Sequence, residues 1–209
     1  MSRDDLLFAQ YDLRQVMEAQ QKRMVAEIDA LSSDRILRED VGRLAEEFAA
    51  KFTLQPPQLD ETKITTDHQE VQVDISGDPS RLIHDRSRPF YRAGTQIQFF
   101  VPFTGEEDLF KCQPSTYTLN PPRGKVVGRD LVLTYTSLQH DAPATKAEFD
   151  RDLGSIKGYL ECVVKDVAPH NASLEELATK RIGMRREKLQ KDQGLAAEMG
   201  FPVRRRGDR

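Results

Sequence analysis

The stretch Thr95-Gln-Ile-Gln-Phe-Phe-Val-Pro-Phe103 decides the fold that this sequence predicts. Ile97, Phe99 and Val101 stand at every second position, which is the period of a strand that buries one of its faces. The following Thr104-Gly105-Glu106-Glu107 has the polar and glycine content of a hairpin connection. The sequence therefore predicts a strand over residues 95–103, after which the chain reverses.

Strand patterns also occur on both sides of this segment. Val71, Val73 and Ile75 alternate with polar residues, and a turn at residues 77–80 follows them. After the hairpin connection, short apolar runs predict strands over 108–112, 125–127 and 131–135. Together these segments predict an antiparallel sheet of about five strands, one face of which needs cover.

The residues before the sheet have the 3.6-residue period of helices. One apolar stripe predicts a long helix over 5–31, and it consists of Leu6, Leu13, Met17, Met24, Ile28 and Leu31. Residues 32–34 then supply an N-cap, and a second stripe predicts a helix over 34–52. We expect these helices to form an antiparallel hairpin. Two consecutive prolines, Pro56 and Pro57, indicate that residues 53–69 form a linker.

The C-terminal third also has helical signals. Thr145 and Glu148 form one capping box, and Ser173 and Glu176 form a second. These boxes predict helices over about 146–167 and 174–192, and Pro169 between them predicts a break. We therefore expect a C-terminal helical hairpin as well.

The expected fold class is α+β, with an antiparallel sheet of about five strands flanked by N-terminal and C-terminal helical hairpins. The expected organisation is a helical hairpin over 1–52, a linker over 53–69, a core over 70–203 and a basic tail over 204–209. The segment from Asn171 to Val203, a cationic helix followed by Gly-Phe-Pro-Val, resembles the tails of small bacterial proteins and implies no activity.

Composition excludes several classes of protein. No stretch approaches the ~18 apolar residues of a membrane span, and the charged N-terminal segment does not have the pattern of a signal peptide. We therefore expect a cytoplasmic protein without membrane contact. The two cysteines, Cys112 and Cys162, are expected to be buried and reduced. No spacing of histidines and cysteines predicts a metal site, and no cofactor motif is present.

Charge is distributed unevenly along the chain. The formal net charge is −3, yet residues 180–209 carry ten basic and four acidic side chains. Clustered cations neutralise phosphates, so this end is a candidate nucleic-acid interface. Its candidate contacts are Arg181, Arg185, Arg186, Lys188, Arg204, Arg205 and Arg206. A solvated helix face, or an arm that binds an acidic protein, explains the same pattern.

A second candidate lies in the loop over residues 81–92. It contains Arg86, Arg88 and Arg92 together with the adjacent aromatic residues Phe90 and Tyr91. Arginines beside aromatic rings suit phosphate contacts and stacking on bases. The same residues also suit a loop that its aromatic side chains pin to the domain.

The stripe of the first helix is a candidate partner-binding seam. Its central members are Leu13, Met17, Met24 and Ile28. Methionine adapts to irregular contacts, so the seam could serve self-association or docking on another protein. Ordinary packing between helices of one chain is the alternative reading of the same stripe.

Whether the protein is an enzyme stays open, although the sequence favours a protein without catalysis. A metal-dependent nuclease would need acidic groups and a lysine, for which Lys111 is the candidate. The candidate acidic groups are Asp74, Glu106, Glu107 and Asp108, and His84 and Asp85 could join them. We expect instead a non-catalytic binding or adaptor subunit of a larger cytosolic assembly that also contacts nucleic acid. A self-associating or partner-docking protein without nucleic acid, and the nuclease or other hydrolase, are the alternatives.

Overall fold

The computed structural model describes residues 5–77, 85, 87–138 and 141–199. The chain folds into two compact units. The sheet unit comprises Met1–Leu13 and Gln55–Lys165, and the helical unit comprises Arg14–Leu54 and Asp166–Arg209. The elements are β1 (Tyr11–Asp12), α1 (Leu13–Ala30), α2 (Ser33–Arg38), α3 (Val41–Phe52), β2 (Gln58–Leu59), η2 (Glu61–Lys63), β3 (Thr65–Asp74), β4 (Tyr91–Thr104), η3 (Glu107–Lys111), β5 (Cys112–Gln113), β6 (Lys125–Val127), β7 (Asp130–Ser137) and α4 (Ala142–Glu198).

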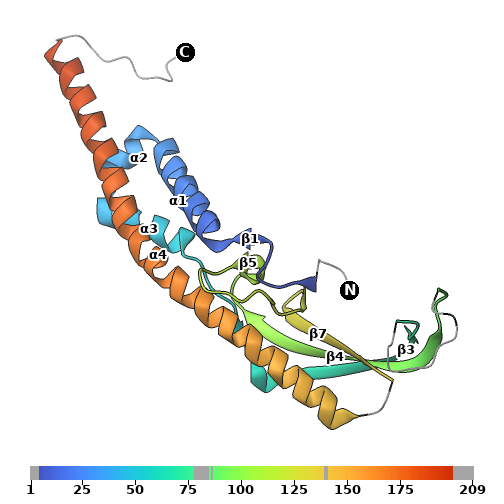
Figure 1. Cartoon of the computed structure of the whole chain (residues 1–209). Coiled ribbons are helices and arrows are strands. Elements are labelled where there is room, and N and C mark those ends of the chain that lie inside the picture. The colour runs from blue at the N-terminus through green and yellow to red at the C-terminus, as the bar shows by residue number, and fades with distance from the viewer. Residues whose placement is uncertain (1–4, 78–84, 86, 139–140, 200–209) are drawn as a thin grey trace. The chain divides into compact units, whose positions relative to one another are not determined.

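The predicted α+β class is confirmed, and β4 is the central strand of a five-stranded antiparallel sheet (Figure 1). One edge of β4 pairs with β3 over ten residues and with the short β2, and its other edge pairs with β7. The strand β6 follows outside β7. The alternation predicted for 95–103 holds, because Phe99 and Val101 are buried while Ile97 is half-buried.

The first part of α4, up to Lys165, covers the apolar face of this sheet. Phe149 on α4 stacks on Phe99 of β4 with 4.1 Å between the ring centroids. The Tyr135 hydroxyl of β7 donates to Asp152 Oδ2 at 3.0 Å. The buried side chains of α4 in this unit also include Leu153, Ile156, Tyr159, Leu160 and Val163. Burial of apolar surface between helix and sheet thus forms the core of the sheet unit.

Residues 5–12 do not belong to the first helix, so the prediction of a helix over 5–31 was wrong at its start. Leu7 and Phe8 are buried in the sheet unit instead, and the Leu7 amide donates to the Pro122 carbonyl at 2.9 Å. The strand β1 pairs in parallel with β5. The prediction that apolar residues of this segment are buried was correct, but their packing against the sheet unit outweighs the helical preference that their spacing indicates.

The segment 34–52 forms two helices. Glu39 is extended, and Asp40 then caps α3 by accepting a hydrogen bond from the Arg43 amide at 2.9 Å. The predicted linker 53–69 contains β2, η2 and the first half of β3. Residues 65–70 are all exposed and polar, which removes the alternation by which a sequence reveals a strand. The predicted strand over 108–112 is mostly the 3₁₀ helix η3.

The predicted break at Pro169 was wrong, and α4 continues through it as one helix. A proline inside a helix costs about 3 kcal/mol. Here the residues on both sides of Pro169 are tied down, because Val167 and Leu174 are buried. This packing offsets the cost, so one long helix stands where a C-terminal hairpin was expected.

The helical unit packs α1, α2 and α3 around the second part of α4. Its core consists of Met24, Ile28, Ile36, Leu44, Ala45, Phe48, Phe52, Leu174, Ala178 and Ile182. Asn171 of α4 binds the backbone of Leu54 twice, since its Oδ1 accepts from the Leu54 amide at 3.0 Å and its Nδ2 donates to the Leu54 carbonyl at 2.8 Å. Among the described residues, no helix combines the length and apolarity needed to cross a membrane.

Candidate functional site

The basic face of α4 lies against the ends of α1 and α2. Arg181 pairs with Asp29 through Nε at 2.7 Å and Nη2 at 2.5 Å. Arg185 Nη1 donates to the Ile28 carbonyl at 2.5 Å, and its Nη2 donates to the Leu31 carbonyl. These carbonyls belong to the last turn of α1 and the residue after it. The Ile28 carbonyl also accepts from the Leu31 amide at 3.2 Å, and the arginine adds a charged donor at this helix end.

Arg186 acts in the same way on α2. Its Nε donates to the Ile36 carbonyl at 2.7 Å, and its Nη2 donates to the Glu39 carbonyl. The bidentate hydrogen bonds between Arg181 and Asp29 lower the pKa of that carboxyl group and raise the pKa of the guanidinium. The three arginines are thus brought together, and each guanidinium has a partner within the helical unit.

The remaining basic candidates of this end differ from those three. Lys188 is exposed on α4. Arg204, Arg205 and Arg206 lie outside the described residues. A phosphate would therefore meet Lys188 without competition, whereas it would have to displace existing hydrogen bonds at Arg181, Arg185 and Arg186.

The candidate seam on α1 faces the interior. Met24 and Ile28 are fully buried in the core of the helical unit, and Leu13 is buried at the start of α1. Met17 is half-buried. The stripe therefore packs within the chain, and the residues that could bind a partner must be sought on other surfaces.

The end of the β3–β4 ribbon presents a different surface. The first four residues of β4 pair with β3 alone, because pairing with β7 begins at Thr95. At this end Phe90 and Tyr91 are more than half exposed, at 53% and 58%. Arg92 is exposed as well, and the side chain of Arg88 is 87% exposed with Asp85 at 3.9 Å. Arg86 lies outside the described residues.

Asp74, the last residue of β3, fixes the backbone at this end. Its Oδ1 accepts hydrogen bonds from the Ser76 amide at 2.9 Å and from the Phe90 amide at 3.0 Å. These hydrogen bonds lower the pKa of the carboxyl group, which keeps it ionised. The Ile75 amide also donates to the Phe90 carbonyl at 2.8 Å. The backbone of Phe90 is thus held while its ring faces solvent.

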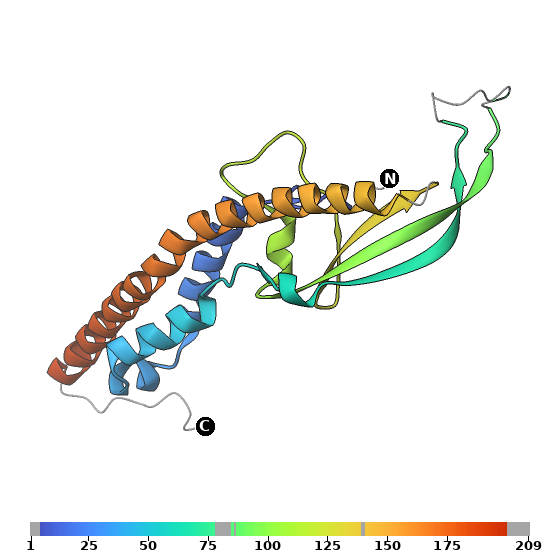
Figure 2. The same cartoon turned by 90° about the horizontal axis from the view of Figure 1, so that it is seen from below.

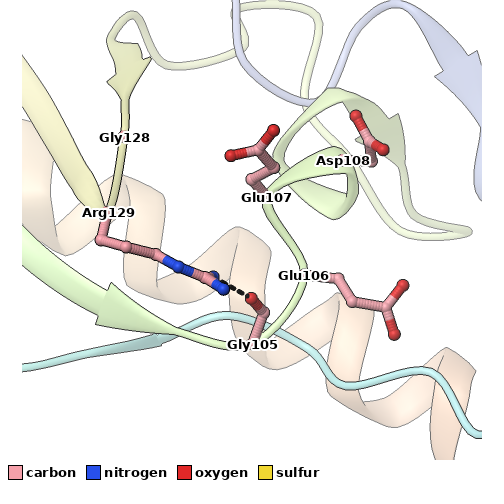
Figure 3. A pocket seen from close by; sticks show the side chains of 6 residues that line it. All are labelled: Gly105, Glu106, Glu107, Asp108, Gly128 and Arg129. Atoms are coloured by element: carbon pink, nitrogen blue, oxygen red, sulfur yellow. Dashed lines mark hydrogen bonds between the residues drawn. The ribbon is translucent and has the colours of Figure 1, made fainter.

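The acidic hairpin connection lines an open hollow of about 540 Å³ (Figure 3). Its lining residues are Gly105, Glu106, Glu107, Asp108, Gly128 and Arg129. Arg129 Nη1 donates to the Gly105 carbonyl at 2.9 Å, and Glu106 Oε1 accepts from the Gln55 amide at 2.8 Å. Glu107 and Asp108 point in different directions (Figure 3). The carboxylates do not converge on one point, and Glu106 has a structural partner.

The residues named for a nuclease are not assembled into one site. Asp74 pairs with Tyr91 at one end of β4, whereas η3 lies at the other end, where Phe110 contacts Phe103 with 5.0 Å between ring centroids. The length of β4 separates these ends by about 45 Å at ~3.3 Å per residue. Lys111 forms an ion pair with Asp108 at 2.7 Å. His84 lies outside the described residues, and among those described no three acidic, histidine or cysteine side chains could hold a metal ion together.

The two cysteines are free thiols. Cys112 is buried, and loss of solvation raises its pKa to about 11. Cys162 is half-buried, so the expectation of burial is confirmed for Cys112 only. A thiol with a raised pKa is a poor nucleophile, because the thiolate is the reactive form.

Sequence reasoning did not identify one surface, the loop segment over residues 114–122 in the connection between β5 and β6. It contains Tyr117 and Leu119, which are 51% and 97% exposed. A signal was present, because none of these nine residues is charged in a chain that is 31% charged.

Comparison with known proteins adds no further information on this site. No protein-family model, no curated protein and no solved structure matches the chain. The function is therefore argued from the surfaces above, of which the end of the β3–β4 ribbon has the most specific chemistry.

Proposed function

We propose that the protein is a non-catalytic cytosolic binding subunit that contacts single-stranded nucleic acid through the end of its β3–β4 ribbon. One observation carries this proposal. The aromatic residues Phe90 and Tyr91 are more than half exposed, and they stand between the exposed Arg88 and Arg92. Single-stranded nucleic acid offers what this surface can bind, namely base faces for the rings and phosphates for the guanidinium groups.

The local charge supports a polyanionic ligand. Residues 81–92 contain four arginines and one aspartate, although the whole chain has a formal net charge of −3. A guanidinium binds phosphate bidentately and also stacks on aromatic or base planes. Contacts of this kind position a strand and carry no sequence information by themselves. We therefore expect binding that depends on salt and tolerates different sequences.

The structure of the exposed end supports stacking on unpaired bases. Asp74 and the Ile75 amide hold the backbone of Phe90, so little freedom of the backbone has to be lost when a base stacks on the ring. In a duplex both faces of each base are already stacked, and the rings would have to separate them. Stacking of an unpaired base on an aromatic ring contributes about 1–3 kcal/mol.

The basic face of α4 contributes less to this proposal. Arg181, Arg185 and Arg186 all have partners within the helical unit. We keep Lys188 and the tail residues Arg204–Arg206 as secondary contacts, because their charges would add to the attraction of a polyanion.

Fluorescence anisotropy with labelled single-stranded DNA, duplex DNA and RNA tests the proposal. Substitution of Phe90→Ala with Tyr91→Ala should weaken binding of the single strands at least tenfold and change binding of the duplex little. Equal losses for all three ligands would assign these rings a structural role. Absence of binding at low salt would remove the nucleic-acid proposal and favour an adaptor that binds protein alone.

A further inference from the structure

The loop segment over residues 114–122 holds two apolar side chains in solvent. Leu119 is 97% exposed and Tyr117 is 51% exposed. The prolines near the two ends of the loop, Pro114 and Pro122, are buried and anchor it to the sheet unit. A single exposed leucine is common, but an exposed tyrosine and an exposed leucine two positions apart in an uncharged segment have the composition of an interface core.

Hydrogen bonds with a side chain of α4 fix the centre of this loop. The Tyr159 hydroxyl accepts from the Thr118 amide at 2.9 Å and donates to the Thr118 carbonyl at 3.0 Å. Tyr159 is itself buried and stacks on Phe8 with 5.1 Å between ring centroids. The residue between Tyr117 and Leu119 is therefore fixed. A loop that is already ordered loses little entropy when its side chains enter a partner.

An apolar groove of about 430 Å³ lies on the other flank of the same segment of α4. Its floor is formed by Pro57, Leu59, Leu160 and Val164, and Val164 is 47% exposed. The rim of the groove is charged, because Lys157 donates to Glu61 Oε1 at 2.6 Å and because Glu161 and Lys165 also line it. The apolar floor thus offers contact to an apolar side chain, and the charged rim surrounds it.

The loop and the groove are separated by the outer ridge of α4. Tyr159 and Lys157 are two residues apart, which places them about 200° apart around the helix. Figure 2 shows the same arrangement, because α4 passes between the loop and η2. Gly154 and Gly158 stand on the exposed ridge between the two flanks, and a Cβ at either position would meet no other atom. Glycine destabilises the interior of a helix, and no contact within the described chain requires it here.

We propose that two copies of the chain pair through this surface, with Tyr117 and Leu119 of each copy seated in the groove of the other. Both complementary features lie on one chain, which is the requirement for a two-fold symmetric interface. A cavity of about 150 Å³ holds a benzene molecule, so a groove of about 430 Å³ has room for a tyrosine ring and a leucine side chain. The glycine ridge would let the two α4 helices approach each other closely at the symmetry axis.

Sedimentation velocity of the full chain over a wide range of concentrations tests the pairing. We expect a monomer–dimer equilibrium, and Leu119→Ser and Val164→Glu should each weaken the dimer at least tenfold. Leu195→Ser is the matched control, because Leu195 is 56% exposed on α4 in the helical unit. A wild-type monomer at every concentration, or a dimer that both variants leave intact, would overturn the proposal.

Gly158→Gln separates pairing from folding. Glutamine favours the helix more than glycine does, so the monomer should gain about 1–3 °C in Tm. The longer side chain should at the same time block the approach of the second α4 and weaken the dimer. Gly194→Gln, at an equally open helical position, should raise Tm without changing the dimer. A Gly158→Gln variant that pairs as well as the wild type would contradict the role of the ridge.

Cross-linking identifies the contact itself. In a Cys162→Ser background, one tagged copy would carry Leu119→Cys and an untagged copy Val164→Cys. We expect a disulfide between the two different variants and none in either variant alone. Flotation of a monomeric protein with neutral phosphatidylcholine vesicles, lost in Leu119→Ser, would assign the loop to a membrane surface and overturn the pairing.

Discussion

Arg185 donates a hydrogen bond from Nη1 to the carbonyl oxygen of Ile28 at 2.5 Å, across 157 positions of sequence. The same guanidinium reaches the Leu31 carbonyl, and the neighbouring Arg186 reaches the carbonyls of Ile36 and Glu39. Arginines that resemble a ligand-binding cluster in the sequence thus act as caps for the ends of α1 and α2. A hydrogen bond from a charged donor to a carbonyl at a helix end is a strong contact.

This capping gives a prediction for stability. Substitution of Arg185→Ala should lower the free energy of unfolding of the helical unit by about 1.5–3 kcal/mol, since it leaves two carbonyls without their charged donor. Lys188→Ala is the control, because Lys188 is exposed on the same helix, and it should change stability by less than about 0.5 kcal/mol. Chemical denaturation followed by circular dichroism measures both. Equal stabilities of the two variants would show that the caps contribute nothing.

His170 predicts how stability depends on pH. It is buried on α4, its Nε2 lies 2.8 Å from Gln20 Oε1, and desolvation lowers its pKa below the usual 6.5. As the pH falls through 6.5, the unfolded chain takes up a proton before the folded chain does, so stability is lost. The loss from this residue is complete once the pH has passed the lowered folded pKa.

The test compares the wild type with His170→Gln in urea titrations between pH 8 and pH 5. The difference in unfolding free energy between the proteins should change across this range, with the wild type losing more on acidification. If the unfolding free energies of both proteins change equally with pH, a group other than His170 causes the pH dependence. A constant difference in stability between the two proteins does not change this test, because only the pH dependence of that difference is compared.

The two thiols should differ in reactivity. Burial raises the pKa of Cys112 to about 11, so at pH 8 only about one molecule in a thousand carries its thiolate. Cys162 is half-buried and free. Alkylation by iodoacetamide, followed by peptide mass spectrometry, should modify Cys162 first and Cys112 only after unfolding. Equal rates in the folded protein would contradict the burial of Cys112.

The contact between Tyr159 and Thr118 can be tested by hydrogen exchange. Tyr159→Phe keeps the ring that stacks on Phe8 and removes the hydroxyl group that binds Thr118. The Thr118 amide should then exchange faster, while amides of β4 keep their protection. The net cost should be about 1 kcal/mol, as for a typical hydrogen bond. Unchanged exchange at Thr118 would mean that the loop is held by other contacts.

The hydrophobic pattern of the sequence predicted an element correctly where that element buries one of its faces. The alternation at Ile97, Phe99 and Val101 predicted β4, and apolar runs predicted β6 and β7. The strand β3 begins six residues before the prediction, because its first half is exposed on both faces and carries no alternation. The continuation of α4 through Pro169 depends on packing on both sides of the proline, which no local rule contains.

The candidate site shows the same limit. The sequence identifies Arg181, Arg185 and Arg186 as one cluster, and they do lie together, but their partners are more than 140 positions away. Charge and spacing alone could not distinguish a binding face from an internal cap. The exposure of Phe90 and Tyr91 likewise depends on a ribbon that continues beyond β7.

The salt dependence of single-stranded DNA binding tests the central claim most directly. The wild type would be compared with Arg88→Ala combined with Arg92→Ala, and with Arg38→Ala as the control. Arg38 matches Arg88, since its side chain is 80% exposed and its carboxylate partner is also 3.9 Å away. We predict that the double substitution lowers the slope of log affinity against log salt by about 1.4, and that the control leaves it unchanged. An unchanged slope in the double variant would contradict the assignment of the nucleic-acid contact to the β3–β4 ribbon.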